Sequence, residues 1–163
     1  MTNPIIDENG TQYWYKNYKL HRTDGPAIIF VTGTQHWCKN DEFHREDGPA
    51  VIKANGTQEW WLNGKRHREN GPSVIKANGT QYWHKNGKLH RENGPAILYP
   101  DGLQYWYKND KLHCEDGPAV LYVSGYHTWW LNGMKYEFDE YIKIRFPTDC
   151  KEKMVFLLKW SDK

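Results

Sequence analysis

Five histidines recur along the chain at a constant interval of 23 residues: His21, His44, His67, His90 and His113. Regularly spaced imidazoles could form a metal array or a set of general bases. Strands of a sheet lie about 4.8 Å apart, so a two-strand repeat advances by roughly 10 Å. Ligands of one zinc ion lie only about 2.0–2.1 Å from it. We therefore expect no metal site, and we predict that each imidazole bonds to the backbone of a turn.

An arginine follows four of these histidines: Arg22, Arg45, Arg68 and Arg91. Acidic residues come soon after each of them, so local neutralisation is the expected role, and a phosphate-binding groove is the alternative. The three cysteines, Cys38, Cys114 and Cys150, are odd in number and have no zinc-site spacing. Their pattern favours a reducing compartment, and we expect a cytoplasmic protein. Cys150 stands apart from the repeats and is predicted to be buried or inert.

Motifs of common enzyme classes are missing from the sequence, including the G-x-S-x-G elbow, the P-loop and H-E-x-x-H. An active site needs unlike residues that converge in a pocket. A repeating chain instead places similar residues at regular intervals along a line. We expect a protein that is not an enzyme, with no catalytic residues and no cofactor.

The elements that must position these residues are also repeated. Tryptophans recur at the same interval, at Trp14, Trp37, Trp60, Trp83, Trp106 and Trp129. Each unit joins an aromatic strand to an aliphatic strand, with Asn-Gly or Gly-Pro steps that are typical of turns. Five full units and a partial sixth predict an all-β fold over residues 1–136, an elongated single antiparallel sheet of tandem β-hairpins.

Residues 137–163 have a different pattern, which predicts a small helical cap at the end of the sheet. Phe138, Tyr141, Ile142 and Phe146 have helical spacing. A second segment begins with Asp149 and Glu152 at capping-box spacing and carries Met154, Leu157 and Leu158 on one face. The apolar run 154–158 is also compatible with a strand, and its periodicity does not decide. No signal peptide or membrane span is expected.

The repeat resembles a known family. The string Trp83-His84-Lys85-Asn86-Gly87-Lys88-Leu89-His90, followed by Asp101-Gly102, is similar to the MORN repeat in its 23-residue variant form. The similarity covers about residues 5–136 and is of the kind seen in bacterial, phage and large-virus proteins. It implies hairpin repeats that act as a binding scaffold without activity of their own, in the host cytoplasm if the source is viral. Some MORN proteins contact phospholipids, so a membrane lipid is a weaker candidate partner.

Strand alternation separates a nearly constant tryptophan face from a face that varies between repeats. Constancy suggests packing between neighbouring repeats, so central tryptophans are expected to be more buried than Trp14. Variation suggests a surface that is free for a partner. The candidate partner-binding residues are Trp61, Tyr82, His84, Tyr105, Tyr107 and Trp130. Lys76, Tyr99 and Tyr122 could widen this surface if the pleat places them on the same side.

Composition restricts the kind of partner. The net charge is +2, which gives no strong signal for nucleic acid. The chain has 9 Trp, 11 Tyr and 5 Phe, and such residues are enriched at protein interfaces. The leading hypothesis is therefore a scaffold for protein–protein interaction. The alternatives are a phage or viral inhibitor of one host protein and, more weakly, a binder of phospholipid or single-stranded nucleic acid. The identity of the partner and the oligomeric state stay open.

Overall fold

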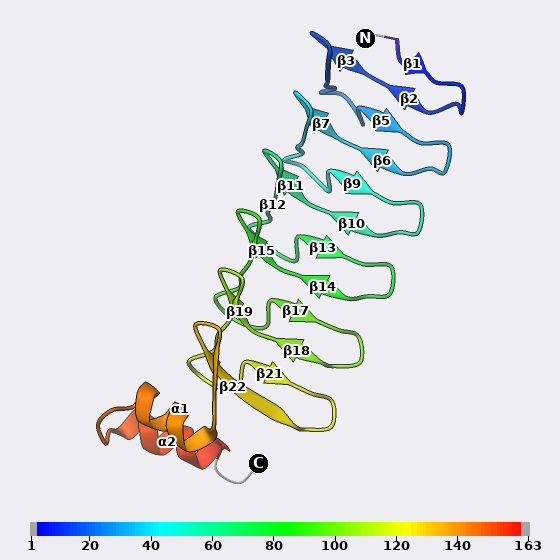
Figure 1. The fold of residues 1–163 in the computed structure, drawn as a ribbon. Helices are drawn as coiled ribbons and strands as arrows, with labels where there is room; N and C mark the ends of the chain where they lie inside the picture. Colours follow the sequence, from blue (N-terminus) through cyan, green and yellow to red (C-terminus); the bar gives the residue numbers. More distant parts are fainter. Residues whose placement is uncertain (1–2, 161–163) are drawn as a thin grey trace. The chain divides into compact units, whose positions relative to one another are not determined.

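The repeated segments fold into antiparallel β-hairpins, and two helices follow them (Figure 1). The computed structural model describes residues 3–160. The chain divides into two compact units, Met1–Lys88 and Leu89–Lys163. Within residues 3–160 the main sheet has thirteen strands. The predicted all-β class, with tandem antiparallel hairpins and C-terminal helices, is confirmed.

In the first unit the main-sheet strands follow one another in chain order. They are β1 (Ile5–Ile6), β2 (Gln12–Tyr13), β5 (Ile28–Ile29), β6 (Gln35–His36), β9 (Val51–Ile52), β10 (Gln58–Glu59), β13 (Val74–Ile75) and β14 (Gln81–Tyr82). Separate two-stranded hairpins are formed by β3 (Tyr15–Lys16) with β4 (Lys19–Leu20), β7 (Cys38–Lys39) with β8 (Glu42–Phe43), and β11 (Trp61–Leu62) with β12 (Lys65–Arg66). The boundary between the units falls within β16 (Lys88–Leu89), which follows β15 (His84–Lys85).

The second unit combines the same hairpins with the helices. Its main-sheet strands are β17 (Ile97–Leu98), β18 (Gln104–Tyr105), β21 (Val120–Leu121), β22 (His127–Leu131) and β23 (Met134–Tyr136). β19 (Tyr107–Lys108) pairs with β20 (Lys111–Leu112). The helices are α1 (Phe138–Arg145) and α2 (Lys151–Trp160).

Each repeat of the first unit contains more strand segments than the two that the sequence predicts, because the aromatic strand bends at its tryptophan. Tyr13 pairs with β5 of the main sheet. The Trp14 N–H then donates to the Ala27 carbonyl at 2.8 Å, and Tyr15 pairs with Leu20 in a hairpin of its own. In the second unit β22 runs through without such a break.

The turns of these small hairpins require positive φ at two successive residues. Asn17 and Tyr18 have φ values of 51° and 62°, as a type I′ turn demands. The N–H of Asp41, which holds the place of Tyr18 one repeat later, donates to the Leu20 carbonyl at 3.0 Å. The Asp41 carboxylate accepts the Leu20 N–H at 2.8 Å in return. Successive turns in this unit are therefore tied to one another.

A row of threonines adds a second link between repeats of the first unit. The Thr57 hydroxyl accepts the N–H of Ala77 at 3.2 Å. Thr80 is the equivalent residue one repeat later and is only 1% exposed, and its hydroxyl has no hydrogen-bond partner among residues 3–160. In the sequence the position equivalent to Ala77 is Pro100, which carries no N–H.

The tryptophan face is covered in a way that the sequence did not indicate. The Arg22 guanidinium lies 4.1 Å from the Trp14 ring, and the Arg68 guanidinium lies 3.9 Å from the Trp60 ring. Trp14 is 7% exposed, whereas Trp60 is only half-buried. The expectation that Trp14 is the less buried of the two is wrong. The stacked arginine does not account for the difference, because both rings carry one.

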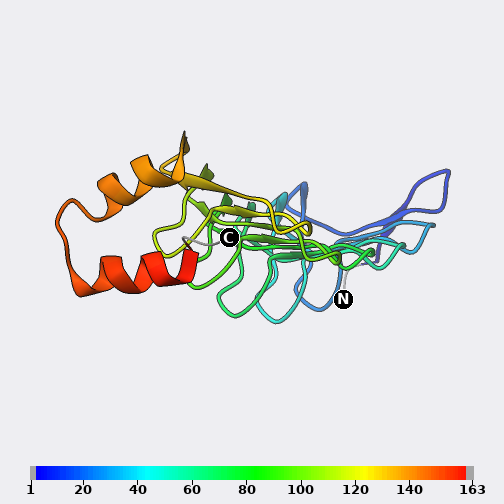
Figure 2. The same cartoon turned by 90° about the horizontal axis from the view of Figure 1, so that it is seen from below.

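The C-terminal segment forms a compact aromatic core within the second unit. The buried members are Trp129, Leu131, Tyr141, Ile142, Phe146 and Phe156. α1 and α2 run side by side and are joined by the short segment 146–150 (Figure 2). The run 154–158 lies inside α2, so the helical interpretation is confirmed and the strand alternative is excluded. Among residues 3–160, no helix is long and apolar enough to cross a membrane.

Three details of this segment differ from expectation. Phe156 provides the buried face of α2, whereas Met154 and Leu158 are 63% and 79% exposed. The Asp149 carboxylate pairs with the Lys153 ammonium at 2.6 Å, and the reciprocal contact of a capping box lies instead at α1, where the Glu137 N–H donates to Glu140 Oε2 at 3.4 Å. Cys150 is exposed and not buried. Residues 161–163 of the predicted cap lie outside the described residues.

Candidate interaction surface

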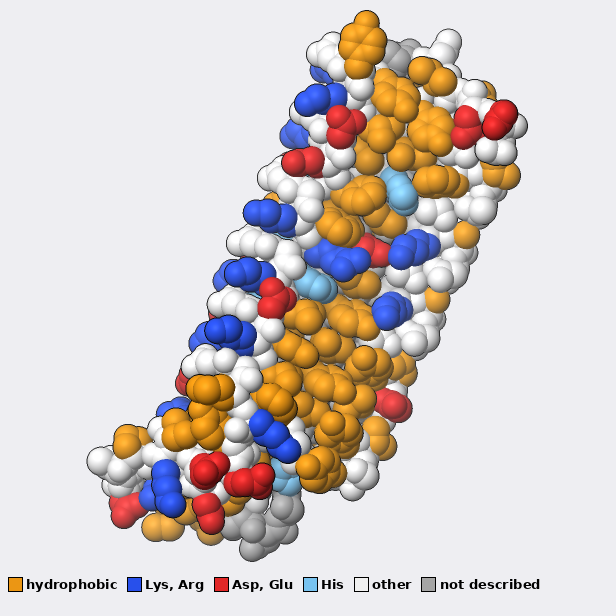
Figure 3. All heavy atoms as spheres, in the orientation of Figure 1, with side chains coloured by type: hydrophobic (Ala, Val, Ile, Leu, Met, Phe, Trp, Pro, Cys, Tyr) orange, Lys and Arg blue, Asp and Glu red, His pale blue; other side chains and the backbone are white. Residues whose placement is uncertain are grey.

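One face of the hairpins carries residues that differ from repeat to repeat, and we call it the variable face. In the first unit it consists of Tyr13, Tyr15, Phe30, His36, Phe43, Lys53, Glu59, Trp61, Arg66, Lys76, Tyr82 and His84. In the second unit it consists of Tyr99, Tyr105, Tyr107, Tyr122, Tyr126, Thr128 and Trp130. Figure 3 shows hydrophobic side chains gathered on one face over the hairpins of each unit, with charged side chains among those of the first unit.

Aromatic rings of the first unit form a continuous row across neighbouring hairpins. The Phe30 and His36 ring centroids are 4.9 Å apart, and those of His36 and Phe43 are 5.1 Å apart. Phe43 in turn lies 5.3 Å from Trp61. These separations are typical of favourable aromatic pairs. Burial lowers the pKa of His36, so this ring stays neutral at physiological pH.

A buried carboxylate lies at the end of this row. Glu59 is 4% exposed. Its carboxylate accepts the Lys53 ammonium at 2.9 Å, Arg66 Nη2 at 3.0 Å and the Trp61 indole N–H at 3.2 Å. Burial raises the pKa of Glu59, but the hydrogen bonds from Lys53 and Arg66 outweigh this effect, and the net pKa lies below its ordinary value. The group is therefore ionised and neutralised by its neighbours.

Tyr82 and His84 lie together in the first unit, with ring centroids 6.4 Å apart, and the Lys76 ammonium lies 4.8 Å from the Tyr82 ring. His84 Nδ1 is 2.7 Å from Ser73 Oγ. Such a pair is the starting geometry of nucleophilic catalysis. Ser73 is 0% exposed, however, and its hydroxyl donates to the Tyr82 carbonyl at 3.1 Å. The contact therefore orients the His84 ring and offers no accessible nucleophile.

Tyrosines dominate the variable face of the second unit. The Tyr105 ring lies 6.1 Å from Tyr99 and 6.5 Å from Tyr107. Tyr122 lies 5.5 Å from Tyr126. Burial and the neighbouring Tyr122 raise the pKa of Tyr105, so its hydroxyl stays protonated. The surface offers rings with hydroxyl groups at their edges, which suits contacts that are partly apolar and partly hydrogen-bonded.

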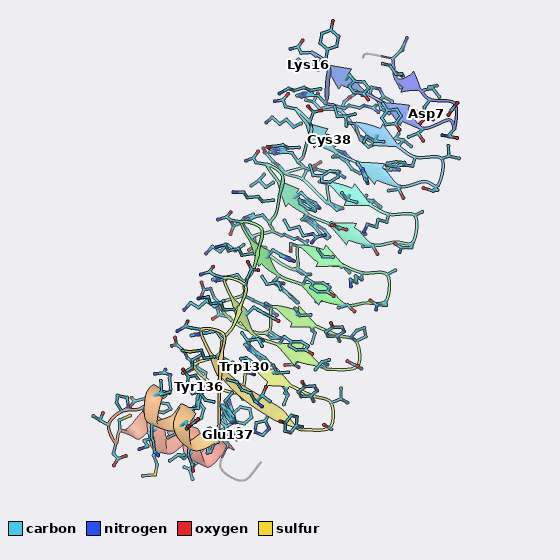
Figure 4. The ribbon with its side chains drawn as sticks, in the orientation of Figure 1. Asp7, Lys16, Cys38, Trp130, Tyr136 and Glu137 are labelled. Atoms are coloured by element: carbon cyan, nitrogen blue, oxygen red, sulfur yellow. The ribbon has the colours of Figure 1, made fainter. Side chains whose placement is uncertain are left out.

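The six predicted partner-binding residues are all half-buried. Trp61, Tyr82 and His84 belong to the first unit, and the structure brings the last two together. Tyr105, Tyr107 and Trp130 belong to the second unit, where Trp130 lies on β22 (Figure 4). The Trp130 indole N–H donates to Thr128 at 2.8 Å. Lys76 and Tyr99 do lie beside Tyr82 and Tyr105, so they widen the surface.

The sequence reasoning missed Phe30, Phe43 and the Glu59 cluster as parts of the surface. Phe43 shares its repeat position with Leu20, Arg66, Leu89 and Leu112. Comparing these residues would have revealed a third varying position. Glu59 occupies one of the positions that vary between repeats. The order of residues in the sequence does not indicate that the side chains of Lys53 and Arg66 both contact its carboxylate.

The recurrent histidines lie against turns of the following repeat. The N–H of Asn63 donates to His44 Nδ1 at 3.3 Å, and the N–H of Asn132 donates to His113 Nδ1 at 3.1 Å. The other ring nitrogen of His44 contacts Glu46 at 3.3 Å. The predicted backbone contact is present in these repeats, whereas the Nδ1 atoms of His21 and His90 contact the side-chain Oδ1 atoms of Asn40 and Asn109 at 3.0 and 2.9 Å. Among the described residues, His, Cys, Asp and Glu form no group of three that could hold a metal ion.

No protein-family model matches the chain, and a search of curated proteins finds no similar sequence.

Proposed function

We propose that this protein is a non-catalytic, MORN-like repeat module that binds another protein through its variable face. The observation that carries the proposal is the side-chain chemistry of that face. Half-buried rings lie in contact with one another, while the opposite face repeats the same tryptophan and arginine pair. Tyrosine and tryptophan are the residues most enriched at the energetic centres of protein interfaces.

Exposure of the rings supports the same conclusion. Tyr122 and Tyr126 are 39% and 60% exposed although they contact one another, and Tyr15 in the first unit is 39% exposed. Rings held by neighbouring rings lose little conformational freedom when a partner covers them, which favours binding. The partner expected for such a surface is a protein segment with apolar side chains and free backbone hydrogen-bonding groups.

The test compares a pair of tyrosines on the variable face with a single tyrosine outside it. Tyr99→Ala with Tyr105→Ala removes a ring contact from the variable face, whereas Tyr18→Ala removes a fully exposed tyrosine from a turn. The tagged protein is used to capture a partner, and the affinity of the purified pair is then measured by calorimetry. We expect the double variant to bind at least tenfold more weakly, about 1.4 kcal/mol, and Tyr18→Ala to bind normally.

Circular dichroism establishes that the double variant is folded. If a folded double variant binds its partner with unchanged affinity, the variable face of the second unit is not the contact surface. The proposal is then wrong for this unit. If it binds as weakly as expected but Tyr18→Ala does too, the loss does not depend on the face, and the proposal fails as well.

A further inference from the structure

The variable face of the first unit carries charged side chains among its rings (Figure 3). Lys53 follows β9, Glu59 lies on β10, Arg66 lies on β12, and Lys76 follows β13. β10 pairs with β9 on one side and with β13 on the other. Three cations and one carboxylate are therefore carried by neighbouring strands and by the small hairpin that follows β10.

The carboxylate of this group is hidden, whereas the cations are accessible. Glu59 is 4% exposed, so its oxygens face the protein. The side chains of Lys53 and Arg66 are 47% and 40% exposed. Lys76 is exposed as well, and among the described residues it forms no ion pair; its ammonium lies 4.8 Å from the Tyr82 ring. The surface that a partner meets is therefore positively charged.

The cations keep hydrogen-bonding capacity for a second anion. Arg66 uses Nε and Nη2 to bond Glu59, at 3.2 and 3.0 Å, which leaves both N–H groups of Nη1 for a partner. The Lys53 ammonium has three N–H groups and contacts Glu59 at 2.9 Å. The Arg66 guanidinium also lies 4.9 Å from the Trp61 ring. Glu59 and Trp61 thus hold these cations in place before a partner arrives, which lowers the entropic cost of binding.

The positive charge is not cancelled by an acid elsewhere on the same face. Asp7 holds the place of Lys53 two repeats earlier, roughly 20 Å away. Its carboxylate already accepts the Tyr13 hydroxyl at 3.1 Å and two backbone N–H groups. At physiological ionic strength, charges are screened over about 8 Å. Asp7 therefore contributes little to the field at Lys53.

An acidic protein segment matches this surface better than a nucleic acid does. A nucleic acid carries phosphates along its whole length, and proteins that bind it line its path with cations. Here Lys53 and Lys76 are one repeat apart, roughly 10 Å. Uncharged rings flank them, with Phe43 on one side and Tyr82 on the other. A carboxylate between apolar side chains has the complementary pattern.

We propose that Lys53, Arg66 and Lys76 bind a carboxylate of an acidic, apolar segment of the partner protein, whose apolar side chains pack on Trp61 and Tyr82. This inference rests on the proposed function and adds the charge of the partner. Hydrogen bonds between ionised groups are stronger than neutral ones, so the carboxylate fixes the position of the segment on the first unit.

The probe is the peptide acetyl-Leu-Glu-Leu-amide, and its glutamine analogue keeps the shape and removes the charge. The full chain is titrated with each peptide. The indole N–H signal of Trp61 is followed by NMR, because this group donates to Glu59 at 3.2 Å. We expect saturable shifts with the glutamate peptide and at least fivefold weaker binding of the glutamine peptide.

Two results of this titration would overturn the inference. Equal binding of both peptides would mean that the face takes a protein segment without regard to its charge, and the proposed function would still stand. The absence of a shift with either peptide would also contradict the inference, whereas the capture test with Tyr99 and Tyr105 examines the second unit and decides the proposed function separately.

Two other ligands test the chemical class of the partner. Inorganic phosphate should bind more weakly than the glutamate peptide, because it has no apolar side chains to pack on the rings. A thymidine oligonucleotide should also bind more weakly, because the cations do not continue along the face. If either ligand binds more tightly than the glutamate peptide, the partner is not an acidic protein segment and the inference is wrong.

Single lysine variants locate the site. Lys76→Gln removes an exposed cation that takes no part in the bonds to Glu59, so folding is not at risk, and it should weaken binding of the glutamate peptide at least threefold. Lys85→Gln is the matched control. Lys85 is an exposed lysine on β15 that strand alternation places on the opposite side from His84. This variant should bind the glutamate peptide normally.

A triple variant removes the charge of the cluster. The second unit has Tyr99, Tyr105 and Leu112 at the equivalent positions, so Lys53→Tyr, Glu59→Tyr, Arg66→Leu gives the first unit an uncharged set that the chain already uses. The folded triple variant should bind the glutamate and glutamine peptides alike. If the triple variant and Lys76→Gln both keep the wild-type preference for glutamate, the inference is wrong.

Discussion

Replacement of Glu59 by glutamine measures how much the buried carboxylate on the variable face of the first unit contributes to the free energy of unfolding. The substitution keeps the shape and removes the charge. Each hydrogen bond to a charged group contributes about 1.5–3 kcal/mol. The side chains of Lys53 and Arg66 are 47% and 40% exposed and regain water when the carboxylate is lost. We therefore expect a loss of about 2 kcal/mol, below the 3–5 kcal/mol typical of a fully buried pair.

The pH dependence gives the same prediction a second test. Burial raises the pKa of Glu59, but the hydrogen bonds from Lys53 and Arg66 lower it by more. The pKa in the folded state therefore lies below the unfolded value of about 4.3. Stability from this group is fully present above the unfolded pKa and is lost as pH falls through the folded pKa. The gap between wild type and Glu59→Gln should be largest near neutral pH and shrink below about pH 4.

The chain also offers a matched control. The second unit has an uncharged version of the cluster at the equivalent positions, which are Tyr99, Tyr105 and Leu112. The triple variant Lys53→Tyr, Glu59→Tyr, Arg66→Leu should recover the stability that Glu59→Gln loses, because a well-packed apolar set often replaces a buried ion cluster without cost.

Urea unfolding followed by tryptophan fluorescence and circular dichroism measures these free energies. The reasoning is refuted if Glu59→Gln is as stable as the wild type at neutral pH. It is refuted equally if the difference is the same at pH 3 and at neutral pH.

Three further predictions follow from single residues. Tyr18→Gly should stabilise the protein by about 1 kcal/mol, because Tyr18 has a φ of 62° and buries no surface; unchanged thermal unfolding would contradict this. Thr57→Val should cost about 1 kcal/mol through its lost hydrogen bond, whereas Thr80→Val should be neutral or stabilising; urea unfolding should separate the two, and equal losses would count against the assignment. A thiol reagent should modify exposed Cys150 rapidly, whereas buried Cys38, whose pKa burial raises to about 11, should react only on unfolding; rapid labelling of Cys38 would refute its burial.

The hairpins could be predicted from the sequence because their causes are local. A positive φ at Asn17 and at Gly10 depends on the residue itself and on its immediate neighbours. Because the sequence repeats every 23 residues, the same hairpin forms again in each repeat. Strand alternation is also local, and it places the side chains of Tyr82 and His84 on the same face.

The bend at each tryptophan depended on contacts outside the strand. At Trp14 the strand changes its hydrogen-bonding partner, because the Trp14 N–H donates to the Ala27 carbonyl whereas its own carbonyl accepts the His21 N–H, and residues 14, 21 and 27 meet only after the loop has folded. The position of Trp14 in the first repeat, with one neighbouring repeat instead of two, predicted that it is less buried than a central tryptophan such as Trp60. In the folded protein Trp14 is buried and Trp60 is half-buried.

The helix at 151–160 and the ion cluster at Glu59 also depend on contacts that the local sequence does not specify. A short apolar run is compatible with a strand or a helix, and Phe156 decided between them by packing 5.8 Å from both Trp129 and Tyr141. Glu59 could be read as a surface residue, and only the approach of Lys53 and Arg66 makes its burial possible. The sequence by itself determined the backbone turns, whose energies are local. The tertiary structure decided which side chains are covered, because burial depends on atoms that are distant along the chain.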